Sequence, residues 1–588
     1  MRRWIIALAA LLAFSPMMDA VPAKRGKIVY TQPDGSTIAL YRHGDEFGHW
    51  TTDAQGNVMQ KQADGFYRMV DAREGLTVRQ RAVRRSAASK RMRAAKAGEH
   101  IALGQKHFLV ILVEFSDKEF IETDPNAEFG NLLNEHGYSV NGGTGSARDF
   151  YYDNSHGIFE PVFDVFGPVK LDNKYSYYGG NDSNGYDQRP EQAVIDGCKG
   201  LDDQIDFSRY DNDGDGKVDL VFMYYAGYGE ADSSDDDAIW PHQWELSSAG
   251  KSLTLDGVAI DRYACSNELN PSNILGGIGT VCHEFGHAMG LPDMYDTDGE
   301  DNESAEGLYD FSTMCGGCYN NDSRTPPYFN IEERIILGWL DESAFLEFAK
   351  SGIYTIPPVD ENVAYRTFTD KDGEYFIYEN RSKTGWDTYL PAFGMLVYHV
   401  DKSDRVVYYG VTARELWENW DWYNAINCNG KHPCFYVVPA KDPTNLGYGR
   451  RYYSGYGYYF DSSYYKDLPF PGGATSYTPE SWNGVAGDIS FEDISFQNNL
   501  VKLRANVPSD DLDFCVIADA GSYKAGDRFT FGLVEPENVH PESVAWYFDD
   551  EPVWADSVTL TAGDHVVEAY VTYAGGRTDR VTLEITVK

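Results

Sequence analysis

Basic residues are scarce in this chain. It holds 50 lysines and arginines against 91 aspartates and glutamates, which gives a formal net charge of -41 at pH 7. Such a charge repels the phosphate backbone of DNA and RNA, so we expect no nucleic-acid partner. Abundant carboxylates keep an exported protein soluble, and they also supply the oxygen ligands that calcium prefers.

Long apolar runs are also scarce. The most marked one, residues 4–14, follows Arg2 and Arg3 and is shorter than the roughly 20 residues that a membrane-spanning helix needs. With the small residue Ala20 as a cleavage point, it predicts a secretory signal peptide over residues 1–20. We therefore expect no transmembrane span and a secreted, extracellular protein. Attachment to the cell surface through a C-terminal module stays open.

Cysteine is sparse, with eight in the whole chain and none in residues 21–98. An exported protein can form disulfides, and Cys428 with Cys434 and Cys315 with Cys318 are the candidate bridges. The second pair could instead serve as a redox or zinc site, but no matching pair follows nearby. Because residues 21–98 hold no thiol, latency imposed by this segment would need a carboxylate, an imidazole or steric cover.

Residues 21–98 are predicted to form a propeptide. Short β-like runs separated by turns occupy residues 28–70, and residues 79–96 then carry eight lysines and arginines without one acid. A basic, alanine-rich segment between folded regions is a good target for trypsin-like proteases. A solvated linker helix is the alternative interpretation of residues 79–96, which we call the linker.

A histidine pair carries the strongest chemical signal. His283 and His287 lie four residues apart, so on a helix they project from one face and can bind one tetrahedral zinc ion. Glu284 can take a proton from the attacking water and deliver it to a leaving amine. Gly290 permits the positive φ that ends the helix, and Asp293 then arrives as the third ligand. The pattern predicts a zinc hydrolase.

Other acids compete for the third ligand position. Asp296 lies close by, but the short gap after Gly290 favours Asp293. Glu332 or Glu333, in a helical stretch further on, would serve in a thermolysin-like scheme. An ordinary amphipathic helix with satisfied core histidines is the non-functional alternative.

The stretch over residues 211–219 is typical of a calcium-binding loop. Acids stand at its first, third, fifth and ninth positions and glycine at the sixth, although Phe222 replaces the usual closing glutamate. The expected ligands are Asp211, Asp213, Asp215, Asp219 and the backbone carbonyl of Lys217. A merely acidic turn is the alternative. Asp232 and residues 235–237 indicate a solvated loop more than a second ion site.

Strand patterns dominate the remainder of the chain. Residues 346–507 predict a β-rich domain, in which His399 and Asp401 are better explained as packed residues than as a metal pair. Dense aromatic residues at 408–465 could bind extended peptides or sugars, but filling of surface turns is the favoured interpretation. Residues 508–588, with Trp546 in an early strand, suit an immunoglobulin-like sandwich.

The chain resembles the immune inhibitor A family of secreted bacterial metalloproteases. HEFGHAMGLPDMYD is similar to the family's zinc signature and YDFSTMCGG to its methionine-containing turn. Met314 in that turn, about twenty residues past the third ligand, is the metzincin arrangement. Further similar stretches between about residues 105 and 500 are RDFYYDNSHG, DNDGDGKVDL, DAIWPHQW, ERIILGWL, EYFIYENR and GMLVYHVD.

The resemblance implies a propeptide-activated zinc endopeptidase that also binds calcium. By position it makes Glu284 the general base and Met314 a structural residue beneath the site, with three zinc ligands, His283, His287 and Asp293. Gly316 stands where some metzincins carry a tyrosine that assists the transition state. Tyr309 is therefore a candidate for that role, with packing as its default.

We expect a multidomain protein in which an α/β (α+β) zincin- or metzincin-like catalytic domain is followed by β-sandwich domains. The expected divisions are 1–20 signal peptide, 21–98 propeptide, 99–345 catalytic domain, 346–507 β-rich domain and 508–588 immunoglobulin-like sandwich. The expected function is that of a monomeric secreted zinc endopeptidase that cleaves extracellular proteins or peptides, is made as a zymogen and is stabilised by calcium.

Two alternatives remain. In the first, a secreted binding or adhesion protein carries a vestigial protease domain, but the intact Glu284 argues against it. In the second, the zinc hydrolase cleaves an amide outside a peptide. The long β extensions fit a polymeric substrate better than such an amide.

Overall fold

The computed structural model describes residues 19–45, 48–62, 64–70, 101–182, 186–233, 235–298, 305–452, 458–508, 515–516, 523–534, 541–555, 557–572 and 578–588. The chain separates into two compact units, Met1–Asn506 and Val507–Lys588. The apolar run of the predicted signal peptide and the linker lie outside the described residues. Within the described residues, no helix is both long and apolar enough to cross a bilayer.

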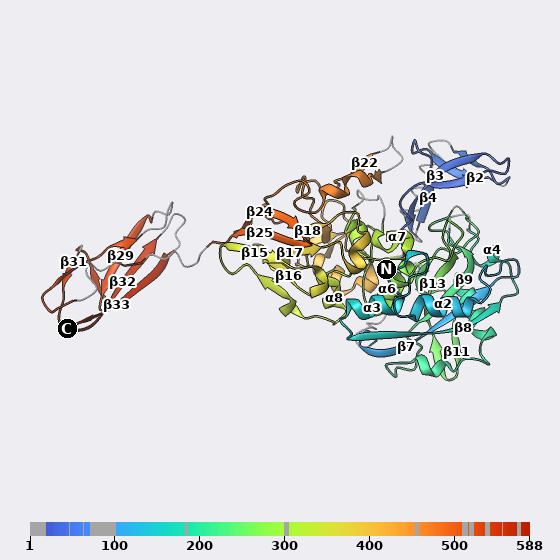
Figure 1. The fold of residues 1–588 in the computed structure, drawn as a ribbon, viewed down its shortest axis with the longest axis horizontal. Helices are drawn as coiled ribbons and strands as arrows, with labels where there is room; N and C mark the ends of the chain where they lie inside the picture. Colours follow the sequence, from blue (N-terminus) through green and yellow to red (C-terminus); the bar gives the residue numbers. More distant parts are fainter. Residues whose placement is uncertain are drawn as a thin grey trace, which may run out of the picture. The chain divides into compact units, whose positions relative to one another are not determined.

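A six-stranded sheet is the scaffold of the first unit (Figure 1). Its order is β1-β10-β13-β9-β7-β8. The bounds are β1 Asp19–Ala20, β7 Gly104–Glu114, β8 Phe159–Lys170, β9 Val221–Tyr228, β10 His242–Glu245 and β13 Arg262–Leu269. The strands β8, β7, β9 and β13 are parallel, whereas β10 is antiparallel to β13 and β1 is antiparallel to β10. The sheet therefore ends in an antiparallel edge.

The strand β7 explains how this sheet is buried. Its apolar run 108–113 has no polar interruption, as expected for a parallel strand covered on both faces. Phe108, Val110 and Leu112 enter one hydrophobic core, and Leu109, Ile111 and Val113 enter another. The apolar run within residues 107–115 predicts a buried strand, and β7 confirms it. The strand β9 begins at Val221, and Val218, three residues earlier, donates its N–H to the Ala259 carbonyl.

Helices cover both faces of the sheet. On the first face lie α2 Pro125–Asn134, α3 Ala147–Asn154 and α6 Gly279–Met289, and on the second lies α5 Pro190–Gly200. A capping box, in which the side chains of Ser146 and Asp149 exchange hydrogen bonds with each other's backbone, starts α3. Shorter helices are α4 Tyr175–Tyr178, α7 Asn320–Ser323, α8 Ile331–Ile336, α9 Ala413–Glu418 and α10 Trp420–Tyr423. The 3₁₀ turns are η1 Val140–Gly142, η2 Phe207–Tyr210, η3 Tyr309–Phe311, η4 Gly316–Tyr319, η5 Glu342–Ala344, η6 Val359–Glu361, η7 Gly385–Tyr389 and η8 Ser462–Asp467.

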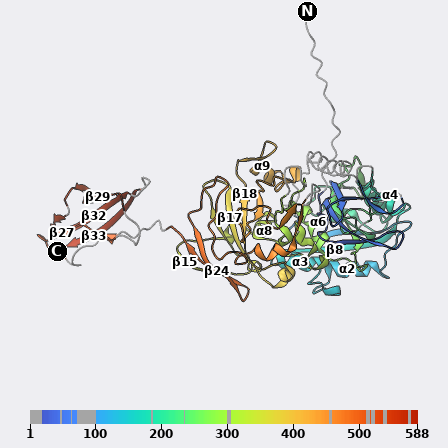
Figure 2. The ribbon, with the colours of Figure 1, turned by 90° about the horizontal axis from the view of Figure 1, so that it is seen from above.

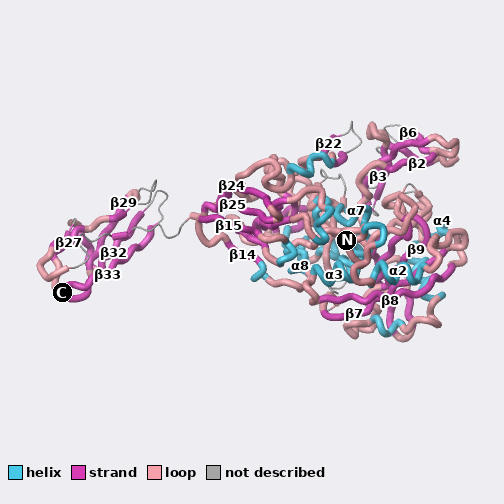
Figure 3. Tube along the Cα trace, viewed as in Figure 1, coloured by secondary structure: helices cyan, strands magenta, loops and turns pink. Residues whose placement is uncertain are grey.

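Residues 345–506 are rich in strands (Figure 3). Two larger sheets have the orders β14-β16-β17-β18-β21 and β15-β25-β24. Their strands are β14 Phe345–Glu347, β15 Gly352–Ile356, β16 Ala364–Phe368, β17 Glu374–Arg381, β18 Gly394–Asp401, β21 Phe435–Val437, β24 Ser490–Gln497 and β25 Leu500–Asn506. Small hairpins pair β11 Leu253–Leu255 with β12 Val258–Ile260, β19 Val406–Tyr408 with β20 Val411–Thr412, and β22 Arg450–Tyr452 with β23 Tyr458–Phe460. One hydrophobic core runs from Ile101 to Leu468, so this region shares its core with the helices around α6.

A separate five-stranded antiparallel sheet precedes the scaffold in the chain, and we call it the N-terminal sheet (β2, β3 and β4 in Figure 1; blue in Figure 2). It comprises β2 Ile28–Thr31, β3 Thr37–Asp45, β4 Gly48–Thr52, β5 Val58–Lys61 and β6 Tyr67–Met69 in sequential order. Its small cores hold few buried residues. A sheet with so little core depends on packing against the rest of the chain.

The second unit consists of short antiparallel sheets around its own core. Its strands are β26 Cys515–Val516, β27 Arg528–Thr530, β28 Leu533–Val534, β29 Ser543–Phe548, β30 Glu551–Val553, β31 Ser557–Thr559, β32 Gly563–Thr572 and β33 Thr578–Val587. Trp546 packs against this core from β29 and is only partly buried. The unit is β-rich, and its immunoglobulin-like character stays a prediction.

Candidate functional site

The helix α6 places two imidazoles and one carboxylate around a common point. The Nε2 atoms of His283 and His287 lie 3.1 Å apart. The Oδ1 atom of Asp293 lies 3.2 Å from the first nitrogen and 3.4 Å from the second. An ion with bonds of about 2.0–2.1 Å to tetrahedral ligands holds them roughly 3.3–3.4 Å apart. The three atoms therefore have the spacing of three corners of a zinc tetrahedron.

The other nitrogen of each ring fixes the tautomer. His283 Nδ1 donates to the Thr313 carbonyl at 2.8 Å, and His287 Nδ1 donates to the Leu291 carbonyl at 2.8 Å. Each Nε2 lone pair is then directed at the site. Burial lowers the pKa of His283. Burial alone would raise the pKa of Asp293, but the electrostatic interactions with the neighbouring imidazoles, first His287 and then His283, lower it to about 2. One carboxylate anion and two neutral imidazoles form a ligand set that suits zinc.

Asp293 is held by a residue that the sequence did not indicate. Asn424 donates from Nδ2 to Asp293 Oδ2 at 2.7 Å, and its Oδ1 accepts the Asp293 N–H at 3.1 Å. The other carboxylate oxygen, Oδ1, is buried and accepts no hydrogen bond, so it faces only the two imidazoles. An orphaned buried oxygen at this point fits a metal ligand. A distant asparagine gives no sequence signal.

The turn that holds Met314 packs against α6. Met314 is fully buried, and its carbonyl accepts the Met294 N–H at 2.8 Å. A Cβ on Gly286 would come within 2.6 Å of the Met314 sulfur, so the helix needs glycine there. The helix ends at Gly290 with a φ of 113°, which allows the return to Asp293.

A segment from the start of the described chain crosses this site, and we call residues 19–25 the cleft segment. Its strand β1 pairs antiparallel with the sheet edge β10. The Val21 N–H donates to Glu284 Oε1 at 3.0 Å, and both residues are fully buried. Trp240 Nε1 donates to the Val21 carbonyl at 3.1 Å. The cleft segment thus binds an edge strand and the predicted general base together.

The N-terminal sheet contacts the same region through a buried arginine. Arg42 NH1 lies 3.0 Å from Glu230 Oε1, and its NH2 lies 3.0 Å from Asp236 Oδ1. His49 Nε2 lies 2.9 Å from the same Glu230 oxygen, and its ring stacks on Trp240 at 4.6 Å. Arg42 and Glu230 are 2% and 0% exposed, so this pair is shielded from water. Residues 235–237, for which the sequence indicates a solvated loop, therefore include Asp236 as an anchor for the N-terminal sheet.

The predicted calcium loop gathers three of its acids. Single carboxylate oxygens of Asp211, Asp213 and Asp215 lie within 4.8 Å of one another. Asp219 Oδ2 instead accepts from Asn212, from its backbone N–H at 3.1 Å and from its side chain at 2.6 Å. Burial raises the pKa of Asp219 to about 6. The roles of Asp219 and of the Lys217 carbonyl as ligands stay predictions.

The competing third ligands lie elsewhere. Asp296 belongs to a separate buried group with Asp298 and Cys428. Glu333 accepts from Ser312 at 2.5 Å and completes the capping box of α8. Glu332 accepts from the Tyr375 hydroxyl at 2.9 Å. Asp293 is the acid that the structure brings to the histidine pair.

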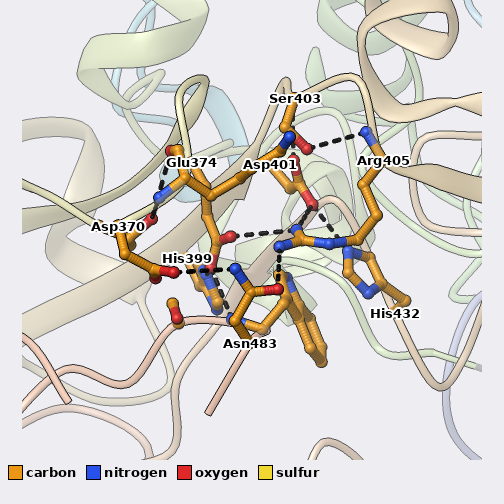
Figure 4. Close-up of polar contacts among 12 residues, drawn as sticks. Asp370, Glu374, His399, Asp401, Ser403, Arg405, His432 and Asn483 are labelled. Atoms are coloured by element: carbon orange, nitrogen blue, oxygen red, sulfur yellow. Dashed lines mark hydrogen bonds and ion pairs between the residues drawn. The ribbon is translucent and has the colours of Figure 1, made fainter. Parts of the chain in front are cut away.

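His399 and Asp401 form part of a polar network rather than a metal pair (Figure 4). His399 Nε2 lies 2.9 Å from Glu374 Oε1, while Asp401 Oδ2 lies 2.6 Å from Arg405 and 2.8 Å from His432. Buried acids satisfied by cations need no metal. The favoured interpretation, packed strand residues, agrees with these contacts.

Two further expectations are wrong in the described structure. Cys315 and Cys318 are thiols, as are Cys428 and Cys434, so neither candidate bridge is present. Cys315 and Cys318 flank the start of η4 and face different surroundings, with the Cys315 sulfur 3.8 Å from the Glu306 carbonyl and Cys318 beside the cleft segment.

Tyr309 does not reach the zinc site. Its hydroxyl donates to the Tyr448 carbonyl at 3.2 Å, and its ring packs on Phe460. The packing role is therefore the one observed.

Comparisons with known proteins agree with this site. Residues 95–328 match the family model described as "Immune inhibitor A peptidase M6, catalytic domain". Immune inhibitor A of Bacillus thuringiensis subsp. alesti is 26% identical over 349 residues, which cover 51% of this chain and 49% of that protein. Pre-pro-metalloprotease PrtV of Vibrio cholerae serotype O1 strain M66-2 is 26% identical over 238 residues, 33% of this chain and 26% of that protein. The chain thus spans about half or less of the length of these relatives.

A solved structure of Clostridium thermocellum CbhA fibronectin(III)-like modules aligns with 13% of this chain and 97% of its own, at 15% identity. Its TM-score of 0.11 supports no inference about the fold.

A histidine pair, an aspartate and an adjacent buried glutamate, set in a domain matched by a peptidase family, have the arrangement of a metallopeptidase site. Residues 95–328 are similar to the catalytic domain of the immune inhibitor A peptidase M6 family.

Proposed function

We propose that this protein is a secreted zinc-dependent endopeptidase that hydrolyses peptide bonds of extracellular proteins. The observation that carries the proposal is the triangle of His283, His287 and Asp293, with edges of 3.1–3.4 Å, next to the buried Glu284. The methionine turn beneath α6 supports a metzincin-like assignment within the zincins.

The residues of the site divide the chemistry between them. The two histidines and Asp293 hold zinc, which when bound polarises the scissile carbonyl and acidifies the attacking water. Glu284 accepts the proton of that water and passes it to the leaving amine. Val21 supports this role, because its backbone nitrogen already lies 3.0 Å from Glu284 Oε1, where a leaving nitrogen would be. The buried surroundings strengthen each of these interactions.

We also propose that the protein is made as a zymogen and that residues 21–98 keep it latent. The cleft segment covers Glu284 by backbone contacts, which agrees with the absence of cysteine from residues 21–98. If a signal peptidase cuts after Ala20, the Val21 nitrogen becomes an ammonium group and its contact with Glu284 becomes a charge pair. Arg42 anchors the N-terminal sheet that carries this segment. Cleavage in the linker would free the segment.

Calcium is proposed as a structural ion at residues 211–219. Asp211, Asp213 and Asp215 supply three oxygens within reach of one ion. The loop lies between η2 and β9, so a bound ion would stabilise the segment that leads into β9, a central strand of the scaffold.

The test uses the full chain after its linker has been cut by trypsin, together with a Glu284→Gln variant treated in the same way. We expect the first to hydrolyse an unfolded protein such as reduced casein, the second to be inactive, and both to hold about one zinc per chain. Equal hydrolysis by both would exclude Glu284 as the base. Zinc binding with no cleavage by either would favour the alternative of a secreted binding protein with a vestigial protease domain.

A further inference from the structure

The cleft segment lies in the site as an extended ligand. In the uncut chain residues 19 and 20, the last two of the predicted signal peptide, pair with β10, and Val21 then places its nitrogen on Glu284. The backbone contacts continue, because Tyr319 donates its hydroxyl to the Pro22 carbonyl at 2.9 Å and Lys24 donates its N–H to the Ala231 carbonyl at 3.1 Å. Regular main-chain bonding to an edge strand is how proteins bind extended peptides of varied sequence. The side chains of this segment therefore show where the side chains of a bound peptide would lie.

The first pocket takes the Val21 side chain. Val21 is 0% exposed and packs with Ala231, Trp240 and Cys318, which are themselves buried. The buried residues that pack on the Val21 side chain are apolar. A charged side chain here would lose its hydration against this apolar wall, which is strongly unfavourable.

The second pocket takes the Arg25 side chain, four residues further on. Arg25 NH2 lies 2.9 Å from Glu306 Oε2, and its NH1 lies 3.4 Å from Asp310 Oδ1. Its guanidinium also stacks over Phe460, at 5.5 Å from the ring centre. Glu306 shares its second oxygen with Arg450 at 3.4 Å, so Asp310 keeps the pocket acidic.

We propose that the cleft selects substrates with an aliphatic residue directly after the scissile bond and an arginine or lysine as the fifth residue after it. The proposal rests on the proposed function, since it equates the Val21 nitrogen with the leaving nitrogen. The Arg25 side chain is 34% exposed, so its pair with Glu306 is partly screened and changes binding by about tenfold rather than more.

A binding experiment tests the acidic pocket without catalysis. A full chain with Glu284→Gln carries a specific protease site within the linker, so that after cutting the N-terminal portion stays bound only by contacts. Dilution followed by gel filtration gives its dissociation constant. We expect Arg25→Ala to raise this constant about tenfold, and Lys27→Ala, which removes the same charge from an exposed neighbour, to leave it unchanged. Equal effects of the two variants would overturn the acidic pocket.

The pocket residues provide the reciprocal variants. Glu306→Gln should weaken binding of the unmodified N-terminal portion and reduce the further effect of Arg25→Ala, because the two substitutions remove one interaction. Asp310→Asn serves as a second variant should the first fold poorly. Fully additive effects in both cases would exclude direct pairing.

Substrate peptides then test the selection itself. Quenched-fluorescent peptides keep residues 17–27 in order and vary the position of Arg25 or of Val21, with the wild-type chain cut at its linker as the enzyme. At the Arg25 position, we expect alanine in place of arginine to lower kcat/KM about tenfold, and glutamate to lower it about tenfold further. At the Val21 position, we expect aspartate in place of valine to lower kcat/KM at least about 100-fold. Cleavage of all peptides at equal rates would overturn the selection and leave the endopeptidase intact. Failure to cleave any peptide or casein would refute the proposed function, while the binding experiment would still decide the pockets.

Discussion

Removal of the Arg42 side chain should release the enzyme from latency without any cut in the linker. Arg42 is 2% exposed, pairs with Glu230 at 3.0 Å and with Asp236 at 3.0 Å, and donates to the Ser233 carbonyl at 3.3 Å. In an Arg42→Ala variant the docked state would bury Glu230 with its strongest partner gone, whereas the undocked state would hydrate it. Breaking a buried pair in this way costs about 3–5 kcal/mol.

This cost falls on docking of the N-terminal sheet. It lowers the docking equilibrium constant by roughly two to three and a half orders of magnitude. The assay is hydrolysis of a quenched peptide by the uncut chain, compared with the same chain after cutting. We expect Arg42→Ala to approach the activity of the cut enzyme, while the wild-type chain stays latent.

Two variants make the result interpretable. Arg68→Ala removes an arginine from the same sheet whose pair with Asp64 is about half exposed, at 52% and 54%, so latency should be unchanged. Glu230→Gln breaks the anchor from the other side and leaves the N-terminal sheet intact, so it should also activate. If Arg42→Ala and Glu230→Gln both stay as latent as Arg68→Ala, the anchoring role of the pair is refuted.

Three further predictions concern metal and pH. Asp293→Asn should weaken zinc binding by at least about 100-fold, measured as zinc retained after dialysis against a graded chelator, and retention equal to the wild type would rule out Asp293 as a ligand. Asp213→Asn should abolish the rise in melting temperature that calcium gives the wild-type chain in a thermal-shift assay; an unchanged rise would place the ion elsewhere. Burial lowers the pKa of His242 to about 4, so as the pH falls the unfolded histidine takes up its proton first, near 6.5, and stability is lost between about pH 6.5 and 4. At low pH the free energy of unfolding, measured with denaturant, should be lower by about 3 kcal/mol, and a His242→Gln variant should lack this loss. An identical dependence on pH in the variant and the wild type would contradict the role of His242.

The grouping of the proposed zinc ligands could be predicted from the sequence because their positions are set locally. His283 and His287 share a helix face by the 3.6-residue period alone, and Gly290 ends that helix with the positive φ that glycine tolerates. The parallel strand β7 was equally visible, since an uninterrupted apolar run is typical of a strand covered on both faces.

The contacts that complete the site could not be predicted in this way. Asn424 meets Asp293 across 131 residues, and Val21 meets Glu284 across 263 residues. Neither contact leaves a periodic pattern, because both depend on how separate elements pack. The role of Asp236 as an anchor for Arg42 was hidden for the same reason, since an acidic stretch read by itself resembles a solvated surface.

The cysteine expectation failed for a different reason. A spacing of three residues allows a bridge between Cys315 and Cys318, but the backbone turn between them decides whether the sulfurs face each other. The expected domain boundary near residue 346 rests on a change from mixed to strand-rich patterns. This change of secondary structure does not separate two hydrophobic cores, because one core extends from Ile101 to Leu468.

Zinc K-edge X-ray absorption of the purified, linker-cut chain tests whether His283, His287 and Asp293 hold one zinc ion. We expect about one zinc per chain with a first shell of nitrogen and oxygen only, at about 2.0–2.2 Å, and loss of the oxygen contribution from Asp293 in the Asp293→Asn variant. A sulfur shell near 2.3 Å would place zinc on cysteines instead, and a spectrum unchanged by the variant would show that the ion is bound elsewhere.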